Sequence, residues 1–151
     1  ESAVRPSLEA GRVGWTFRPL DEAAMREAAN HVMGEHDFSA FRAAECQANS
    51  PVRTLTESRV SRQGDWLIFD FAANAFLQHM IRNLVGALVT IGKGDAPATL
   101  MIELLAQKNR TLSPPTFMPD GLYLTAVDYD AGWGLPTAGL SGDPLQIFNF
   151  R

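Results

Sequence analysis

The sequence has few of the residues that mark several common classes of protein. Its 151 residues include a single cysteine, Cys46, so the chain can form no internal disulfide and no cysteine-rich zinc site. The three histidines have no ligand-like spacing, and no metal site is predicted. There is also no glycine-rich phosphate loop and no Gly-x-Ser-x-Gly nucleophile turn. Motifs alone therefore identify no complete active site.

An excess of positive charge is missing as well. Lys and Arg number 13 against 17 Asp and Glu, which gives a net charge of −4, so any contact with a polyanion must come from a local patch. The only lysines are Lys93 and Lys108; the other basic residues are arginines, which suit bidentate contacts with phosphate or carboxylate. Neither a signal peptide nor a membrane-spanning run is recognisable, so we expect a cytoplasmic protein without a membrane partner.

Hydrophobic periodicity predicts an α+β fold. Asp21 is the expected N-cap of the first helix, and Gln63, Gly64 and Asp65 form the turn of a hairpin. The predicted elements are, in order, a helix at 21–33, strands at 52–60 and 66–75, helices at 75–92 and 98–109, and a strand at 122–130. This order favours an antiparallel sheet covered on one face by helices. Residues 1–20 are expected to lead into the fold, 21–130 to form the subdomain, and 131–151 to form an irregular tail.

One charge interrupts the most apolar stretch of the sequence. Arg82 is the only formal charge between Asp70 and Lys93. A guanidinium cannot lose its proton, so a partly buried one needs an anion or several acceptors. Gln78 and Asn83 lie nearby in the sequence, so one interpretation is that Arg82 belongs to a polar patch. The alternative is an arginine whose stem packs while its head reaches water or a structural carboxylate such as Asp70.

A second feature is a local group of arginines and aromatics at residues 38–62. The basic and acidic members are Arg42, Arg53, Arg59 and Arg62 against Glu45 and Glu57. Phe38 and Phe41 stand beside them, and such a mixture can stack bases and contact phosphates. A solvated hairpin with two core phenylalanines explains the same pattern equally well.

Four stretches, in order along the chain, together resemble the C-terminal half of the tRNA pseudouridine synthase I family. They are GEHDFSAFRAAECQANSPVRTL, ANAFLQHMIRNLVGALVTIG, LLAQKNRTL and GLYLTAVDYD, and the similarity extends over about residues 5–130. The resemblance implies an enzyme that isomerises uridines on the 3′ side of the tRNA anticodon stem-loop. It implies an aspartate nucleophile that acts on a flipped-out uridine, with no cofactor and no metal.

The resemblance also implies partners for this chain. In the family the aspartate lies in a Gly-Arg-Thr-Asp-Ala-Gly type motif of the N-terminal half, and no such motif occurs here. The chain is therefore expected to be a C-terminal portion that is inactive without the missing N-terminal half of the same protein. Family members are homodimers whose RNA cleft draws on both subunits, so a homodimer that binds a tRNA anticodon stem-loop is expected.

Individual site residues follow from the same resemblance. Arg82 falls in a Met-x-Arg-Asn pattern and is expected to pair with the catalytic aspartate, with Phe76 and Asn83 as active-site neighbours. The residues expected to contact tRNA are Arg42, Glu45, Cys46, Gln47, Ala48, Asn49 and Arg53. The alternative function is a non-catalytic RNA-binding or dimerisation module. A third hypothesis, a hydrolase built on Cys46, has no surrounding signature.

Overall fold

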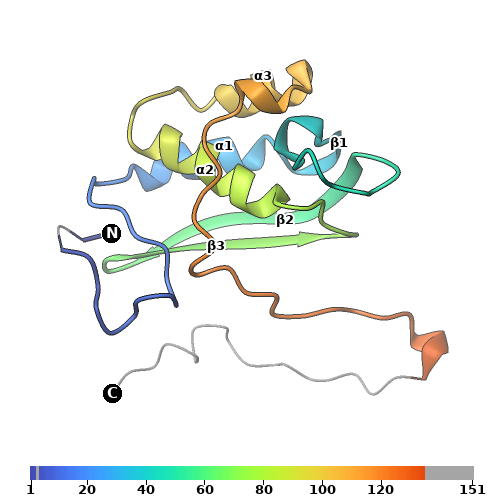
Figure 1. Cartoon of the computed structure of the whole chain (residues 1–151), viewed down its shortest axis with the longest axis horizontal. Coiled ribbons are helices and arrows are strands. Elements are labelled where there is room, and N and C mark those ends of the chain that lie inside the picture. The colour runs from blue at the N-terminus through green and yellow to red at the C-terminus, as the bar shows by residue number, and fades with distance from the viewer. Residues whose placement is uncertain (3, 135–151) are drawn as a thin grey trace. The chain divides into compact units, whose positions relative to one another are not determined.

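The structure is a computed structural model that describes residues 1–2 and 4–134. These residues divide into a unit formed by Glu1–Gly121 and a second unit that begins at Leu122. The first unit holds a three-stranded antiparallel sheet of order β1-β2-β3, with the helices on one face (Figure 1). This arrangement confirms the predicted α+β class. The predicted domain boundaries stay predictions, and most of the predicted irregular tail at 131–151 lies outside the described residues.

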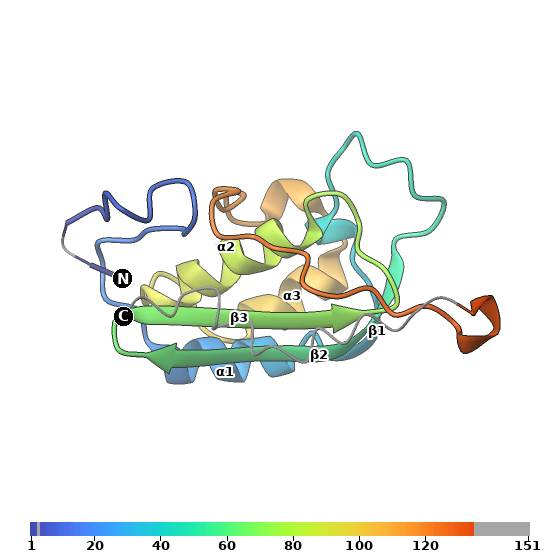
Figure 2. The same cartoon turned by 90° about the horizontal axis from the view of Figure 1, so that it is seen from below.

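The elements of the described chain are α1 (Glu22–Asn30), β1 (Gly34–Asp37), η1 (Ser39–Phe41), β2 (Val52–Gln63), β3 (Trp66–Ala73), α2 (Met80–Gly92), α3 (Leu100–Gln107), η2 (Arg110–Leu112) and η3 (Ala131–Trp133). Figure 2 shows β2 and β3 side by side along their length. None of these helices, over the part of the chain that the structure covers, is long and apolar enough to cross a membrane.

The first helix and the hairpin form where the sequence predicts them. The Asp21 carboxylate accepts a hydrogen bond of 3.0 Å from the Ala24 N–H and caps α1, which ends at Asn30, three residues before the predicted end. The hairpin turns at Gly64, whose φ of +59° suits glycine. Phe69 and Phe71 are two residues apart on β3, and both pack against the core.

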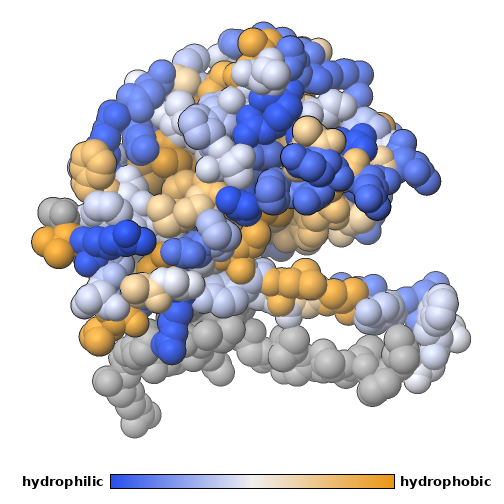
Figure 3. All heavy atoms as spheres, viewed as in Figure 1, coloured by the Kyte–Doolittle hydropathy of each residue, from blue (hydrophilic) through white to orange (hydrophobic). Residues whose placement is uncertain are grey.

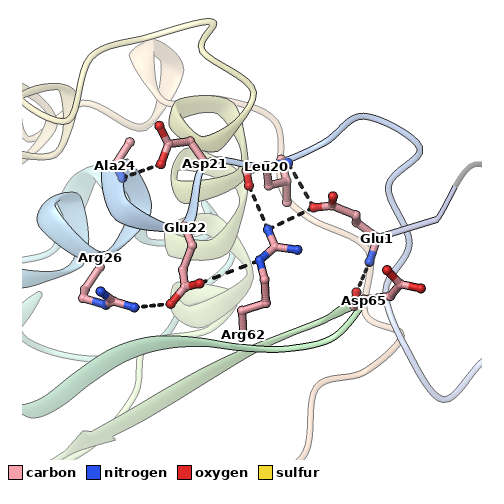
Figure 4. Close-up of polar contacts among 8 residues, drawn as sticks. All are labelled: Glu1, Leu20, Asp21, Glu22, Ala24, Arg26, Arg62 and Asp65. Atoms are coloured by element: carbon pink, nitrogen blue, oxygen red, sulfur yellow. Dashed lines mark hydrogen bonds and ion pairs between the residues drawn. The ribbon is translucent and has the colours of Figure 1, made fainter.

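Arg62 joins the end of β2 to the start of α1. Its Nη2 donates to the carbonyl oxygen of Leu20 at 2.8 Å and to the Glu1 carboxylate at 3.1 Å (Figure 4). Its Nε lies 3.7 Å from the carboxylate of Glu22 (Figure 4). This arginine therefore holds the helix layer to the sheet, and its terminal nitrogen is committed to that contact.

Two strand assignments differ from the sequence expectation. β1 is an additional strand that pairs Gly34–Asp37 with β2; its sequence, Gly-Glu-His-Asp, is too short and polar to show an apolar alternation. The strand predicted at 122–130 is wrong, because these residues form no regular structure. A strand exists only when a neighbour supplies its hydrogen bonds, which the alternation of one segment cannot show.

The apolar helix begins later than predicted. α2 begins at Met80, not at residue 75, because His79 adopts a left-handed conformation with φ of 61°. The carbonyl oxygen of Gln78 bonds outside the helix, because it accepts a 3.1 Å hydrogen bond from the Ala43 N–H. Within α2 the buried apolar side chains include those of Met80, Leu84, Ala87, Leu88 and Ile91.

Candidate functional site

Arg82 lies in the first turn of α2 and is only partly buried. Its Nε donates a hydrogen bond of 2.9 Å to the carbonyl oxygen of Phe117, and the Phe117 N–H donates one of 3.1 Å to the Arg82 carbonyl oxygen. Within residues 1–2 and 4–134, the terminal nitrogens Nη1 and Nη2 have no hydrogen-bond or ion-pair partner. Four of the five N–H donors of this guanidinium are therefore free to bind an acceptor.

Asp70 is not the partner of Arg82. Its carboxylate accepts hydrogen bonds from Nε and Nη2 of Arg59, at 3.2 and 2.9 Å. The two residues are opposite each other in the β2–β3 register, on the sheet face away from the helices. The hydrogen bond and charge of Asp70 raise the pKa of Arg59 above its ordinary value. The interpretation in which Asp70 neutralises Arg82 is therefore wrong.

Residues 113–121, which we call the strap, cross α2 next to Arg82 (Figure 1). The contact with α2 is close: a Cβ added at Gly86 would lie 2.2 Å from the carbonyl oxygen of Pro115. On the side of the N-terminal segment, a Cβ at Gly14 would lie 2.4 Å from the Phe117 ring. Glycine at both positions lets the strap pack directly on the neighbouring backbone.

A buried polar network fastens the strap beside Arg82. Asn83 is 1% exposed and donates from Nδ2 to the Phe41 carbonyl oxygen at 2.7 Å. Its Oδ1 accepts from the Thr116 hydroxyl at 2.7 Å and from Arg110 Nη2 at 3.1 Å. Asn83 was predicted as an active-site neighbour. Arg110 and Thr116 were not singled out, because neither the short helix η2 nor the strap shows a periodic pattern. The only signal was that Arg110 belongs to a stretch with family resemblance.

The loop at residues 42–50 is organised by its own arginines. Arg42 Nη2 donates to the carbonyl oxygens of Cys46 and, at 2.9 Å, of Ala48. Arg53 Nη1 donates to the carbonyl oxygens of Ser50 and Val52, at 3.0 and 2.6 Å. Both predicted tRNA-contacting arginines thus shape the loop backbone.

The loop exposes polar side chains and buries its cysteine. Glu45, Gln47 and Asn49 are exposed, and hydrophilic residues gather on this side of the molecule, at the right of the view in Figure 3. Cys46 is buried, and the N–H groups of Ala48 and Gln78 lower the pKa of its thiol. A sulfur that is largely covered is poorly placed to attack a substrate, which argues against the hydrolase hypothesis.

The aromatic residues near this loop have different roles. Phe38 and Phe41 are completely buried, so the hypothesis that they stack on bases is wrong and the core interpretation is confirmed. Phe76, a predicted active-site neighbour, is 39% exposed and precedes α2. Over the described residues, no group of three His, Cys, Asp or Glu side chains is arranged to hold a metal ion.

Comparison with known proteins identifies the family. The family model described as tRNA pseudouridine synthase matches residues 28–130. The chain is 59% identical over 133 residues to tRNA pseudouridine synthase A of Methylobacillus flagellatus, covering 88% of this chain and 51% of that protein. For the protein of the same name from Aromatoleum aromaticum the identity is 59% over 138 residues, covering 91% and 52%. The chain therefore belongs to the tRNA pseudouridine synthase family, which consists of isomerases, and it spans about half the length of these curated relatives.

Proposed function

We propose that this chain supplies the arginine that orients the catalytic aspartate of a tRNA pseudouridine synthase. The observation that carries the proposal is Arg82, whose Nε is held by Phe117 while its terminal nitrogens are unpaired among the described residues. Paired N–H donors of a guanidinium match the two oxygens of a carboxylate. The carboxylate belongs to an aspartate outside this chain, because the family's Gly-Arg-Thr-Asp-Ala-Gly type motif does not occur in its 151 residues.

The reaction proposed for the whole protein is the isomerisation of uridines on the 3′ side of the anticodon stem-loop. The bond from C1′ to N1 breaks, the uracil turns, and a bond from C1′ to C5 forms. The proton on C5 is released and N1 takes up a proton, so no atom is gained or lost and no cofactor is required. The uridine must leave the base stack before the aspartate can reach it. A nearby guanidinium keeps that aspartate ionised and correctly oriented.

The loop at residues 42–50 is the proposed tRNA contact. Arg42 fixes its backbone through the carbonyl oxygens of Cys46 and Ala48, and polar side chains point outward. The backbone N–H of Ala43 bonds to Gln78, just before α2, so the loop is tied to the helix that carries Arg82. A homodimer and a cytoplasmic location are part of the same proposal.

A chimera tests this function. The chain is joined to the part of the Methylobacillus flagellatus enzyme that it does not match, and pseudouridine is measured in a tRNA anticodon arm. We expect product from the chimera, none from the chain alone, and product formation at least about 100-fold slower from the chimera carrying Arg82→Ala. Pseudouridine formation by the chain alone would contradict the proposed origin of the nucleophile.

The same experiment separates the alternative function. A non-catalytic RNA-binding or dimerisation module would bind tRNA or self-associate but give no product in the chimera. A folded chimera that binds the anticodon arm and forms no pseudouridine would therefore favour the module over the enzyme.

A further inference from the structure

We infer that Arg110 and Thr116 are positioning residues that fix Arg82, so that it meets a carboxylate with its two terminal nitrogens and not with Nε. This inference rests on the proposed function and adds the geometry of the pairing and the residues that set it. It follows from how the first turn of α2 and the strap are joined.

The two segments are joined at successive residues. Arg82 bonds to Phe117 through its Nε at 2.9 Å and through its backbone at 3.1 Å. The next residue of α2, Asn83, bonds to the preceding residue of the strap, Thr116, at 2.7 Å. Because the links are adjacent, the position of the Phe117 carbonyl, and with it the plane of the Arg82 guanidinium, depends on the contact between Asn83 and Thr116.

Arg110 completes this junction. Its Nη2 donates to Thr116 Oγ1 at 2.9 Å and to Asn83 Oδ1 at 3.1 Å, and its Nη1 donates to the carbonyl oxygens of Ser113 and Pro114, each at 3.2 Å. One partly buried guanidinium thus collects four acceptors from α2 and the beginning of the strap. A lysine has a single ammonium group on a flexible stem and cannot reproduce this planar fork.

The helix allows the strap little freedom to shift. The Pro115 carbonyl oxygen packs so closely on Gly86 that a Cβ there would lie 2.2 Å away. The strap residues on either side of Pro115 carry the Arg110 bonds and the Phe117 bonds. The strap therefore packs on α2 in one position. In that position Nε of Arg82 already donates its hydrogen bond to Phe117. A carboxylate must then approach Nη1 and Nη2 at the end of the guanidinium.

Arg110→Lys and Thr116→Val test the inference in the chimera and in the chain. Each should lower kcat by about 10- to 100-fold and leave KM for tRNA unchanged, because small errors in orientation slow chemistry more than binding. In the chain, ¹⁵N NMR should find faster hydrogen exchange at the Arg82 Nε–H of both variants. Thr116→Ser keeps the hydroxyl, so its kcat and its hydrogen exchange at the Arg82 Nε–H should match those of the unmodified protein.

Arg18→Lys is the matched control. Arg18 also donates to a backbone carbonyl, that of Lys93 at 2.8 Å, and pairs with Asp95, but at the opposite end of α2. It should change neither kcat nor the exchange of the Arg82 Nε–H. If Arg18→Lys lowers kcat as much as Arg110→Lys does, the effect is general loosening of α2 and the inference is wrong.

Failure of the inference and failure of the proposed function give different results. If Arg82→Ala leaves the chimera fully active, the role of Arg82 itself is wrong. If Arg82→Ala abolishes activity while Arg110→Lys and Thr116→Val leave kcat and Nε–H exchange unchanged, only the positioning inference is overturned.

Discussion

The side-chain Nε of Arg82 and the carbonyl oxygen of Phe117 are joined by a hydrogen bond of 2.9 Å. This bond orients a guanidinium whose terminal nitrogens have no partner in the portion of the chain that the structure describes. A guanidinium that the fold holds in one direction, with no counterion among the described residues, suits the proposed pairing with a carboxylate of another segment. Under the proposed function, this pairing is the reason for an arginine in the most apolar stretch of the sequence.

Arg82 should contribute little to folding. Arg82→Met keeps the packing of the stem and removes one hydrogen bond, so we expect the free energy of unfolding to fall by about 1 kcal/mol or less. Asn83→Ala should cost about 2–3 kcal/mol, because it leaves the Phe41 carbonyl and the Thr116 hydroxyl without their buried partner. Urea denaturation measures both values. A larger loss for Arg82→Met than for Asn83→Ala would mean that Arg82 is structural.

The close packing of the strap on α2 predicts different losses of stability when two glycines of this helix are replaced. Gly86→Ala places a methyl group against the Pro115 backbone and should destabilise the protein by about 2–3 kcal/mol. Gly92→Ala is the matched control. Its methyl group meets the flexible side chain of Met25, and the loss should be about 1 kcal/mol or less. Equal losses for the two variants would contradict the close contact between the strap and α2.

The fold was predictable where the information is local. The cap at Asp21, the turn at Gly64 and the apolar helix each depend on residues close in sequence, and each was predicted. The left-handed conformation of His79 was not, because the tertiary contact between Gln78 and Ala43 determines where α2 begins. β1 was missed and the strand at 122–130 was wrongly predicted for a related reason. A strand depends on a pairing partner, and the alternation of apolar and polar residues in one segment does not show whether that partner exists.

Asp37 should make stability depend on pH. Burial raises its pKa, but hydrogen bonds from Ser39 and the charge of Lys108 at 3.2 Å lower it more, so the folded pKa lies below the ordinary 3.8. Its contribution is therefore complete above pH 3.8 and is lost as the pH falls through the folded pKa.

Asp37→Asn tests this dependence. It should lower the free energy of unfolding by about 1 kcal/mol at pH 7 and by less as the pH approaches the folded pKa. Glu35→Gln, at an exposed position of the same strand, is the control and should cost nothing measurable. A loss for Asp37→Asn that stays constant from neutral to acidic pH would contradict the assigned cause.

Arg42 should act on tRNA binding through the shape of its loop. Arg42→Gln removes charge-assisted bonds to the Cys46 and Ala48 carbonyl oxygens, and we expect KM of the chimera for tRNA to rise by about 10-fold with a smaller change in kcat. Arg59→Gln removes an arginine from the far face of the sheet and should leave KM unchanged. If both variants have the same KM for tRNA as the unmodified chimera, the loop is not part of the tRNA-binding surface.

The candidate site was predictable only in part. Arg82 could be found because a charge in an apolar run stands out, and Asn83 because it is its neighbour. Arg110 and Thr116 could not, because their role comes from contacts that reach from η2 and the strap back to α2, 27 and 33 residues away in sequence. The isolated pattern also left the roles of Phe38 and Phe41 open. Their complete burial shows that both belong to the core.

The most direct test of the central claim is kcat for pseudouridine formation by the chimera with Arg82→Ala and Arg82→Lys. Both variants should lower kcat at least about 100-fold, because neither can bind the Phe117 carbonyl and still offer two coplanar donors to a carboxylate. The unfolding free energy of each should stay close to that of the unmodified protein. A value of kcat for Arg82→Ala within about twofold of the unmodified chimera would contradict the role given to this arginine.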